Sequence, residues 1–292
     1  MAAADPQSVC IVGATLGEGP VWIAQEGALW FVDIKEHRLH RFDPERGILK
    51  SWPAPAQIGW VLPTARQQMI VGLQTGLHRF DPATGRFALV AAPEPDLPGN
   101  RLNDATTDPA GRLWFGSMDD AEKAATGHVY RFGGRVETTS IAPVVITNGP
   151  AFSPDGRTLY HVDTLGGLIH AIAVGEDGSL GAARPFARID PADGYPDGPT
   201  VDAAGCLWIG LFGGWAARRY SPAGELLETV RFPVANVTKL AFGGRDLRTA
   251  YATTARKGLD AAARAAQPEA GNLFAFRVEA PGLPVTPVAL KR

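Results

Sequence analysis

The stretch TNGPAFSPDGRTLYHV, residues 147–162, decides the fold. It contains a Gly-Pro turn at residues 149–150, a polar turn at residues 153–156 and an aromatic, β-branched run at residues 159–162. A run of that composition, preceded by turn residues, predicts a short β-strand. The turn before it predicts an antiparallel partner strand immediately upstream.

The same unit recurs along the whole chain. Polar turns also precede the runs at residues 113–116 and 207–210, and the spacing between units is roughly 40 to 50 residues, a period typical of propeller blades. We therefore predict an all-β protein, a six-bladed β-propeller with four-stranded antiparallel blades, formed by residues 1–292 as a single domain. The six runs lie at residues 29–32, 69–72, 113–116, 159–162, 207–210 and 250–253.

The repeat also identifies one equivalent position in each of the six units. Counting back about eight residues from each turn glycine reaches one equivalent position per unit. Because the innermost strands of a propeller begin around one end of its central channel, these positions should converge there. A chance coincidence of Gly-Pro turns in a β-sandwich is the alternative. The six positions are Glu18, Trp60, Asn103, Asn148, Asp197 and Asn236.

Closure of the ring needs a partner for the last unit, since an open ring would expose strand edges. The apolar residues 9–12 precede the first unit and have no blade of their own. We expect them to join the last blade, together with residues 273–276 and 285–290. Residues 259–266 are the best candidate for a helical turn.

Three register positions open nearly identical triplets: Glu18-Gly19-Pro20, Asn148-Gly149-Pro150 and Asp197-Gly198-Pro199. Two carboxylates held close together repel unless a cation compensates them. A set of oxygen ligands suits hard divalent ions such as Ca²⁺, Mg²⁺ or Mn²⁺. Glu18, Asn148 and Asp197 are thus a candidate metal site at one end of the channel, although well-hydrogen-bonded loop residues would show the same pattern. Trp60 would either line a substrate pocket or plug the channel.

Several longer motifs resemble the gluconolactonase/regucalcin family of sugar lactonases. The resemblance extends from about residue 16 to residue 256, and residues 236–239 and 253–259 are similar to bacterial aldonolactonases, xylonolactonase especially. The motifs are LGEGPVW at residues 16–22, WFVDI at 30–34, RLND at 101–104, GRLWFGSM at 111–118, TNGP at 147–150 and YPDG at 195–198.

This resemblance implies an enzyme that hydrolyses sugar-acid lactones to aldonic acids with one bound divalent metal ion. It implies Glu18, Asn148 and Asp197 as metal ligands, and Arg101 and Asn103 as substrate contacts. It also implies an acidic contact within residues 119–122, where the alignment is ambiguous. Ca²⁺ is the ion favoured by ligand type, while Zn²⁺, Mn²⁺, Mg²⁺ and Fe²⁺ stay open. We hypothesise that Asp197 is also the catalytic proton acceptor.

Two other functions remain open. One is a metal-dependent esterase or phosphotriesterase on the same scaffold, and the other is a non-catalytic calcium-binding propeller. No G-x-S-x-G elbow is present, which argues against a serine hydrolase.

Composition excludes other classes of partner. The 28 basic and 30 acidic side chains form no basic stripe, which argues against nucleic acid or an anionic membrane as partner. Cys10 and Cys206 lie far apart and form no CxxC motif, so we expect no disulfide. No signal peptide or membrane-spanning run is apparent. We expect a cytoplasmic monomer whose partner is a small sugar lactone.

Overall fold

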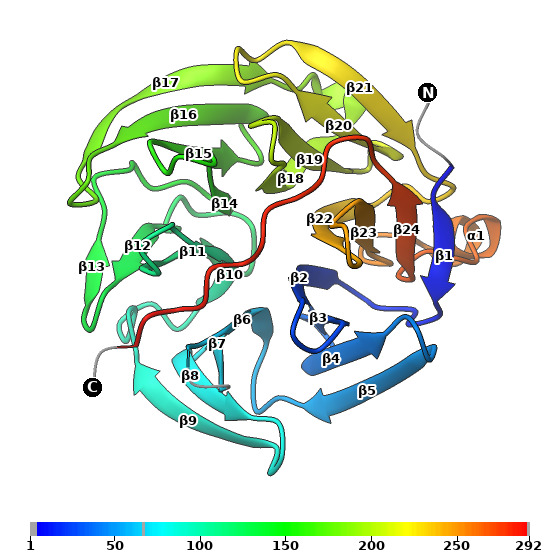
Figure 1. Cartoon of the computed structure of the whole chain (residues 1–292), viewed down its shortest axis with the longest axis horizontal. Coiled ribbons are helices and arrows are strands. Elements are labelled where there is room, and N and C mark those ends of the chain that lie inside the picture. Colours follow the sequence, from blue (N-terminus) through cyan, green and yellow to red (C-terminus); the bar gives the residue numbers. More distant parts are fainter. Residues whose placement is uncertain (1–4, 66–67, 291–292) are drawn as a thin grey trace.

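A computed structural model describes residues 5–65 and 68–290. The protein is all-β, and antiparallel sheets surround a common centre as in a β-propeller (Figure 1). Four sheets have four strands each and one has eight. The predicted strand-rich fold with four-stranded antiparallel units is therefore confirmed.

The four-stranded sheets each run in sequence order from the centre outward (Figure 1). Their strands are β2 (Gly17–Ile23), β3 (Ala28–Asp33), β4 (Arg38–Asp43) and β5 (Ile48–Pro53); β6 (Ile58–Pro63), β7 (Met69–Leu73), β8 (Gly76–Asp81) and β9 (Arg86–Ala91); β10 (Asn100–Thr107), β11 (Leu113–Asp119), β12 (Val129–Phe132) and β13 (Val136–Thr138); and β14 (Thr147–Phe152), β15 (Thr158–Asp163), β16 (Leu168–Val174) and β17 (Leu180–Arg188).

The eight-stranded sheet contains two antiparallel groups of four strands. A single parallel bridge, between Gly198 and Lys239, joins them. One group is β18 (Tyr195–Val201), β19 (Leu207–Phe212), β20 (Ala216–Tyr220) and β21 (Leu226–Arg231), and the other is β22 (Val237–Gly243), β23 (Thr249–Thr254), β24 (Leu273–Arg277) and β1 (Gln7–Cys10).

Closure by the N-terminal strand is confirmed, because β1 pairs antiparallel with β24. The expected helical turn is also present as α1 (Ala261–Ala266), where the Asp260 side chain caps the helix by accepting a hydrogen bond from the Ala263 N–H. A short 3₁₀ helix occupies Pro191–Asp193. None of the helices in the described ranges is long and apolar enough to cross a membrane. Cys10 and Cys206 are both free thiols.

Apolar side chains fill the space between neighbouring sheets. Trp30, Trp114 and Trp208 recur at equivalent strand positions and are fully buried. The indole N–H groups of Trp114 and Trp208 donate to the turn residues Asp108 and Asp202, so in these two units a turn carboxylate anchors the core tryptophan. Burial of each such side chain contributes about 2–3 kcal/mol.

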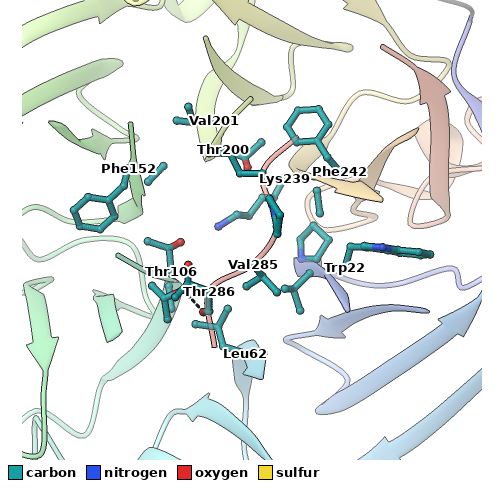
Figure 2. A pocket seen from close by; sticks show the side chains of 18 of the residues that line it. Trp22, Leu62, Thr106, Phe152, Thr200, Val201, Lys239, Phe242, Val285 and Thr286 are labelled. Atoms are coloured by element: carbon teal, nitrogen blue, oxygen red, sulfur yellow. Dashed lines mark hydrogen bonds between the residues drawn. The ribbon is translucent and has the colours of Figure 1, made fainter. Parts of the chain in front are cut away.

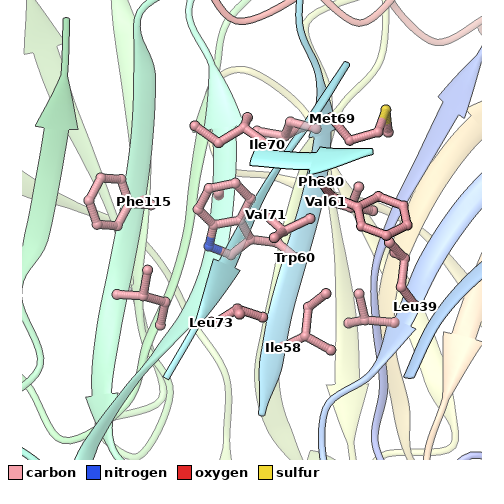
Figure 3. Close-up of a cluster of buried hydrophobic side chains, with 14 of the residues drawn as sticks. Leu39, Ile58, Trp60, Val61, Met69, Ile70, Val71, Leu73, Phe80 and Phe115 are labelled. Carbon is pink, nitrogen blue, oxygen red and sulfur yellow. The ribbon is translucent and has the colours of Figure 1, made fainter. Parts of the chain in front are cut away.

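Trp60 belongs to this core. Its indole packs against Gly72 and lies 6.1 Å from the ring centre of Phe115 (Figure 3). A side chain at Gly72 would collide with the indole, which explains the glycine at this position. Trp60 is therefore a packing residue between sheets; it lines a cavity inside the ring, but not the cavity that contains Glu18 and Asp197.

The C-terminal segment differs from expectation. Residues 285–290 do not extend the last sheet; the tail instead crosses one end of the central channel (Figure 1). Along the way it bonds to strand ends and turns of three of the five sheets. These bonds are Val288 N–H to Pro63 O at 2.8 Å, Ala289 N–H to Gly111 O at 2.9 Å, Ala203 N–H to Pro281 O at 2.8 Å and Gly282 N–H to Leu247 O at 2.8 Å. A segment bonded to several sheets has no blade periodicity, so the repeat could not locate it.

Gly282 offers a test of this tail. A Cβ there would lie 2.1 Å from the Phe242 Cβ, so Gly282→Ala must displace the tail. We expect a loss of about 1–3 kcal/mol in the free energy of unfolding, measured by urea denaturation. Gly133→Ala is the matched control, because a Cβ at residue 133 would meet nothing within 4 Å and the residue has ordinary backbone angles. Equal effects of the two substitutions would contradict the anchoring role of the tail.

Candidate active site

The six innermost strands are β2, β6, β10, β14, β18 and β22, and each contains an irregularity in its pairing. In β2 the register shifts between Glu18 and Val21, and in β14 it shifts between Asn148 and Ala151. The shift in β18 lies between Pro196 and Pro199. A bulge inserts an unpaired residue and redirects the side chains beside it. The predicted site residues therefore occupy positions where the strand bends.

The Gly-Pro dipeptides explain how these bends form. Gly19 and Gly149 have φ values of 55° and 79°, a conformation that glycine adopts readily. Each following proline lacks an N–H group, so it gives up no strand-pairing hydrogen bond at a position where the pairing is interrupted. Gly198 serves a different purpose, because the Lys239 side chain packs 2.6 Å from its hypothetical Cβ.

All five predicted site residues come together. Glu18, Arg101, Asn103, Asn148 and Asp197 are buried and line one cavity of about 310 Å³. The other residues that line it are Leu16, Met118, Glu122, Ile146, Thr164, Leu165, Tyr195, Phe212 and Lys257.

A larger cavity of about 540 Å³ is formed by later residues of the inner strands and by the tail (Figure 2). Lys239 is the single charged side chain among its described lining residues, and no carboxylate lines it. The smaller cavity is therefore the candidate active site.

Two carboxyl groups in the smaller cavity, Glu18 and Asp197, lie in surroundings that disfavour their charged forms. Burial and the charges of Asp197 and Asp104 raise the pKa of Glu18 well above its usual value. Burial, followed by the charge of Asp104, raises the pKa of Asp197 to about 7. Asp104 itself forms a buried ion pair with Lys239. Among the described residues, none forms an ion pair with Glu18 or Asp197, and one divalent ion would neutralise the charge of these two buried groups when they are ionised.

Hydrogen bonds determine the orientation of the Asn148 amide. The Arg101 guanidinium can only donate, so the Asn103 atom 2.6 Å from it is the acceptor Oδ1. Asn103 Nδ2 then donates to Thr147 O at 2.7 Å and to Asn148 Oδ1 at 3.2 Å. Asn148 Nδ2 donates to Thr164 Oγ1 at 2.9 Å. The carbonyl oxygen of Asn148, the atom a hard cation binds, is thereby held in a defined position.

These residues suit a hard cation. Two buried carboxylates and an oriented amide oxygen provide only oxygen donors, the ligands that Ca²⁺, Mg²⁺ and Mn²⁺ prefer. Among the described residues, no group of three or more His, Cys, Asp or Glu side chains is placed to hold a metal ion. The predicted set contains two carboxylates and an amide, so it depends on Asn148 for its third ligand.

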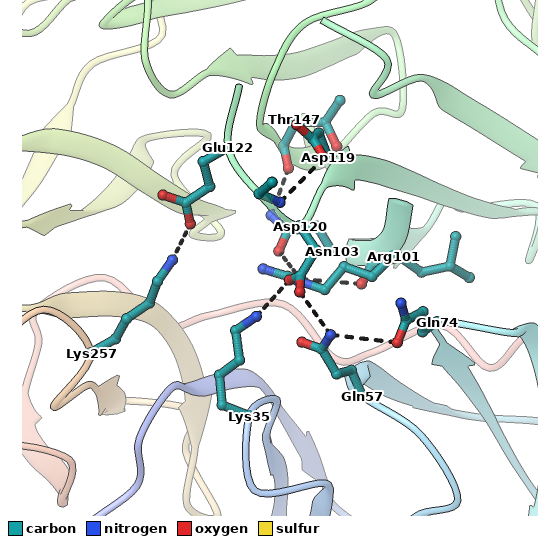
Figure 4. A network of polar contacts seen from close by, with 12 residues as sticks. Lys35, Gln57, Gln74, Arg101, Asn103, Asp119, Asp120, Glu122, Thr147 and Lys257 are labelled. Carbon is teal, nitrogen blue, oxygen red and sulfur yellow. Dashed lines mark hydrogen bonds and ion pairs between the residues drawn. The ribbon is translucent and has the colours of Figure 1, made fainter. Parts of the chain in front are cut away.

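Arg101 stands at the centre of a polar network (Figure 4). Its Nε donates to Asp120 at 2.9 Å, and Lys35 and Gln57 donate to the same carboxylate at 2.6 and 2.9 Å. Partial burial raises the pKa of Asp120, but the hydrogen bonds from Lys35 and Gln57 and the charge of Arg101 outweigh this and lower it to about 2. The guanidinium is thus held rigidly, and within the described ranges its Nη2 has no hydrogen-bond partner.

Asn236, the sixth register position, does not line the cavity. It instead accepts a hydrogen bond from Gly213 N–H at 3.0 Å and donates one to Lys257 O at 2.9 Å.

Some residues of the site were not predicted. Within residues 119–122, Glu122 lines the cavity whereas Asp120 anchors Arg101. Lys257, Thr164 and the Asp104–Lys239 pair were also missed. Asp104 follows a register position directly, a signal that could have identified it.

Sequence and structural comparisons agree with this geometry. Residues 16–256 match the family described as SMP-30/Gluconolactonase/LRE-like region. A 6-deoxy-6-sulfogluconolactonase of Pseudomonas putida is 36% identical over 280 residues, covering 94% of this chain and 95% of that protein. An L-arabinolactonase of Azospirillum brasilense is 35% identical, covering 92% and 90%. A crystal structure of regucalcin, described as a calcium-binding protein, from Agrobacterium tumefaciens superposes with a TM-score of 0.94 at 30% identity, covering 99% of both chains.

A strand-built ring with a buried acidic cavity at the start of its inner strands defines a propeller of the lactonase type. The chain belongs to the SMP-30/gluconolactonase/regucalcin family. The resemblance seen in the sequence motifs is confirmed, as is the class of hydrolase acting on ester bonds at the level of the family.

The Asp104–Lys239 pair gives a first test of the site. Lys239→Met keeps the stem that packs on Gly198 but leaves Asp104 charged and buried beside Glu18. We expect a loss of about 3–5 kcal/mol in the free energy of unfolding of the metal-free protein, measured by urea denaturation. The double variant Asp104→Asn/Lys239→Met should lose distinctly less, because it removes both charges. A single-variant loss under about 1 kcal/mol, as for a surface pair, would contradict this account.

Proposed function

We propose that this protein hydrolyses sugar-acid lactones, such as gluconolactone or xylonolactone, to aldonic acids, with one divalent metal ion. The observation that supports this most is the meeting of two buried carboxylates, an oriented amide oxygen and a rigid arginine in one cavity. The relatives named for lactones of sulfogluconate and arabinose support a lactone of a sugar acid as substrate.

We also propose a ring of six blades in one domain. The eight-stranded sheet divides at the single Gly198–Lys239 bridge into two four-stranded antiparallel groups. Counting each group as a blade gives one blade for each of the six inner strands. The β1–β24 pairing then closes the ring by joining the two ends of the chain's strand order.

The metal ligands in this proposal are Glu18, Asn148 and Asp197. When bound, the ion supplies positive charge that polarises the lactone carbonyl and stabilises the negative charge developing on its oxygen. Ca²⁺ is the ion that these oxygen donors favour, and the regucalcin relative is described as calcium-binding. Zn²⁺, Mn²⁺, Mg²⁺ and Fe²⁺ are the other ions to be compared.

The chain's own residues orient the substrate. Arg101 cannot rotate freely because Asp120 holds its Nε, so its Nη2 donor faces a fixed direction for a ring or hydroxyl oxygen. Asn103 contributes the remaining lone pair of Oδ1 to the substrate while its Nδ2 keeps Asn148 in position. The apolar side chains of Leu16, Ile146 and Phe212 limit the water beside the bound lactone.

Asp197 is the proposed proton acceptor. It is buried in the cavity wall, and a carboxylate there can take a proton from the attacking water. Asp197→Ala that keeps near-normal turnover with metal present would remove it from this role.

Metal-stripped protein tests the proposal. Restoring one metal at a time should restore hydrolysis of polyhydroxylated five- and six-membered lactones, and bound metal should raise the melting temperature without any lactone. Glu18→Gln should weaken the metal affinity about 100-fold or more, since a ligand matters at least as much as the groups that orient it. Glu45→Gln is the matched control, because Glu45 is exposed and does not line the cavity.

The other outcomes separate the alternatives. Binding of Ca²⁺ with no turnover of any lactone would indicate a calcium-binding propeller. Preference for phosphotriesters or aryl esters over sugar lactones would indicate the related hydrolase.

A further inference from the structure

An ion pair between Glu122 and Lys257 joins two partly exposed residues of the active-site cavity lining, a place that we call the mouth (Figure 4). The two residues lie 135 positions apart and come from the segments that follow β11 and β23. Both line the cavity, and about a third of each side chain is exposed (33% and 32%). A substrate that enters the cavity therefore meets this pair.

Glu122 lies in a turn whose backbone is held by the Asp119 carboxylate. The Asp119 carboxylate accepts hydrogen bonds from the N–H groups of Ala121, Lys123 and Ala124 at 3.2, 2.9 and 2.9 Å. Within this turn Glu122 has a φ of 58°, a left-handed conformation that costs a residue with a side chain about 1 kcal/mol or more. The surrounding bonds compensate for this cost and direct the Glu122 side chain to the mouth.

Lys257 is anchored from the other side. Its N–H donates to Thr15 O at 2.8 Å, and its carbonyl accepts from Asn236 Nδ2 at 2.9 Å. With its backbone fixed by two bonds, only the side chain of Lys257 can move. The charge of Lys257 also reaches the buried site, since it acts to lower the pKa of Asp197.

In the described part of the chain, neither side chain forms another ion pair or side-chain hydrogen bond. Arg101 and Lys35 are both held by Asp120, so Lys257 is the cation at the mouth that depends on Glu122 alone. A partly exposed ion pair stabilises a protein by about 0–1 kcal/mol, so variants that break this pair should keep the fold.

We propose that the Glu122–Lys257 pair selects the substituent that the lactone carries far from its ring carbonyl, favouring an uncharged, hydroxyl-bearing chain over a carboxylate-bearing one. This inference rests on the proposed lactonase function. A hydroxyl group can donate to Glu122 and accept from Lys257 while the pair persists. A carboxylate would have to displace Glu122 from Lys257, leaving two negative charges side by side.

Two lactones with the same five-membered ring test this inference. D-Glucono-1,4-lactone and D-glucaro-1,4-lactone differ only at the last carbon, which is a hydroxymethyl group in the first and a carboxylate in the second. The readout is the ratio of kcat/KM for the glucaro-lactone to that for the glucono-lactone, measured with metal-loaded protein. A purely structural effect would change both rates and leave the ratio unchanged.

Opposite single substitutions should shift this ratio in opposite directions. Glu122→Gln frees Lys257 and should raise the ratio about fivefold, whereas Lys257→Met leaves Glu122 unpaired and should lower it about fivefold. The exchanged pair, Glu122→Lys with Lys257→Glu, should bring the ratio back toward that of the wild type. Glu45→Gln again serves as the control and should leave the ratio unchanged.

A second measurement separates this inference from the proposed function. Affinities of the same variants for the products gluconate and glucarate, measured by calorimetry, report the selection without turnover. If the wild type hydrolyses neither lactone but the two single variants show opposed affinity shifts, the lactonase proposal alone would be refuted. Unchanged ratios in both single variants, or shifts in the same direction, would overturn the role of the Glu122–Lys257 pair.

Discussion

The candidate active site depends on the burial of two carboxylates, Glu18 and Asp197, in one small cavity. Each lies at a bulge of an inner strand, and each has a pKa raised first of all by burial. Asp104, the third acid nearby, is neutralised by Lys239, so the remaining negative charge is that of Glu18 and Asp197. Two buried negative charges destabilise a fold unless a cation accompanies them. We therefore propose that a divalent ion binds between them, and the lactonase proposal builds on that ion.

The ring is what allows such a site to exist. Residues from β2, β14 and β18 meet only if the chain closes around a centre, and β1 secures that closure by pairing with β24. At the other end of the channel, the tail bonds to strand ends and turns of three sheets. The acidic cavity and the tail thus lie at the two ends of the inner strands, and loosening either one would disturb the spacing of the same strands.

The features that could be predicted from the sequence are those that recur from unit to unit. The triplets beginning at Glu18, Asn148 and Asp197 share their spacing with the turn glycines, so their convergence could be predicted. Trp60 and Asn236 satisfy the same spacing but serve packing and loop anchoring, because register alone does not say which side of a bulge a side chain occupies. The tail and the Glu122–Lys257 pair have no repeat at all. Their partners are far apart in the chain, and only the folded ring brings them together.

Diffraction from crystals soaked in MnCl₂, recorded at a wavelength where manganese scatters anomalously, tests the central claim most directly. The account predicts one strong anomalous peak within about 2.0–2.6 Å of carboxylate oxygens of Glu18 and Asp197 and of the Asn148 Oδ1 atom. The Glu18→Gln variant should lose that peak under the same soak. A manganese peak elsewhere in the ring, or an empty cavity in crystals saturated with the ion, would contradict it.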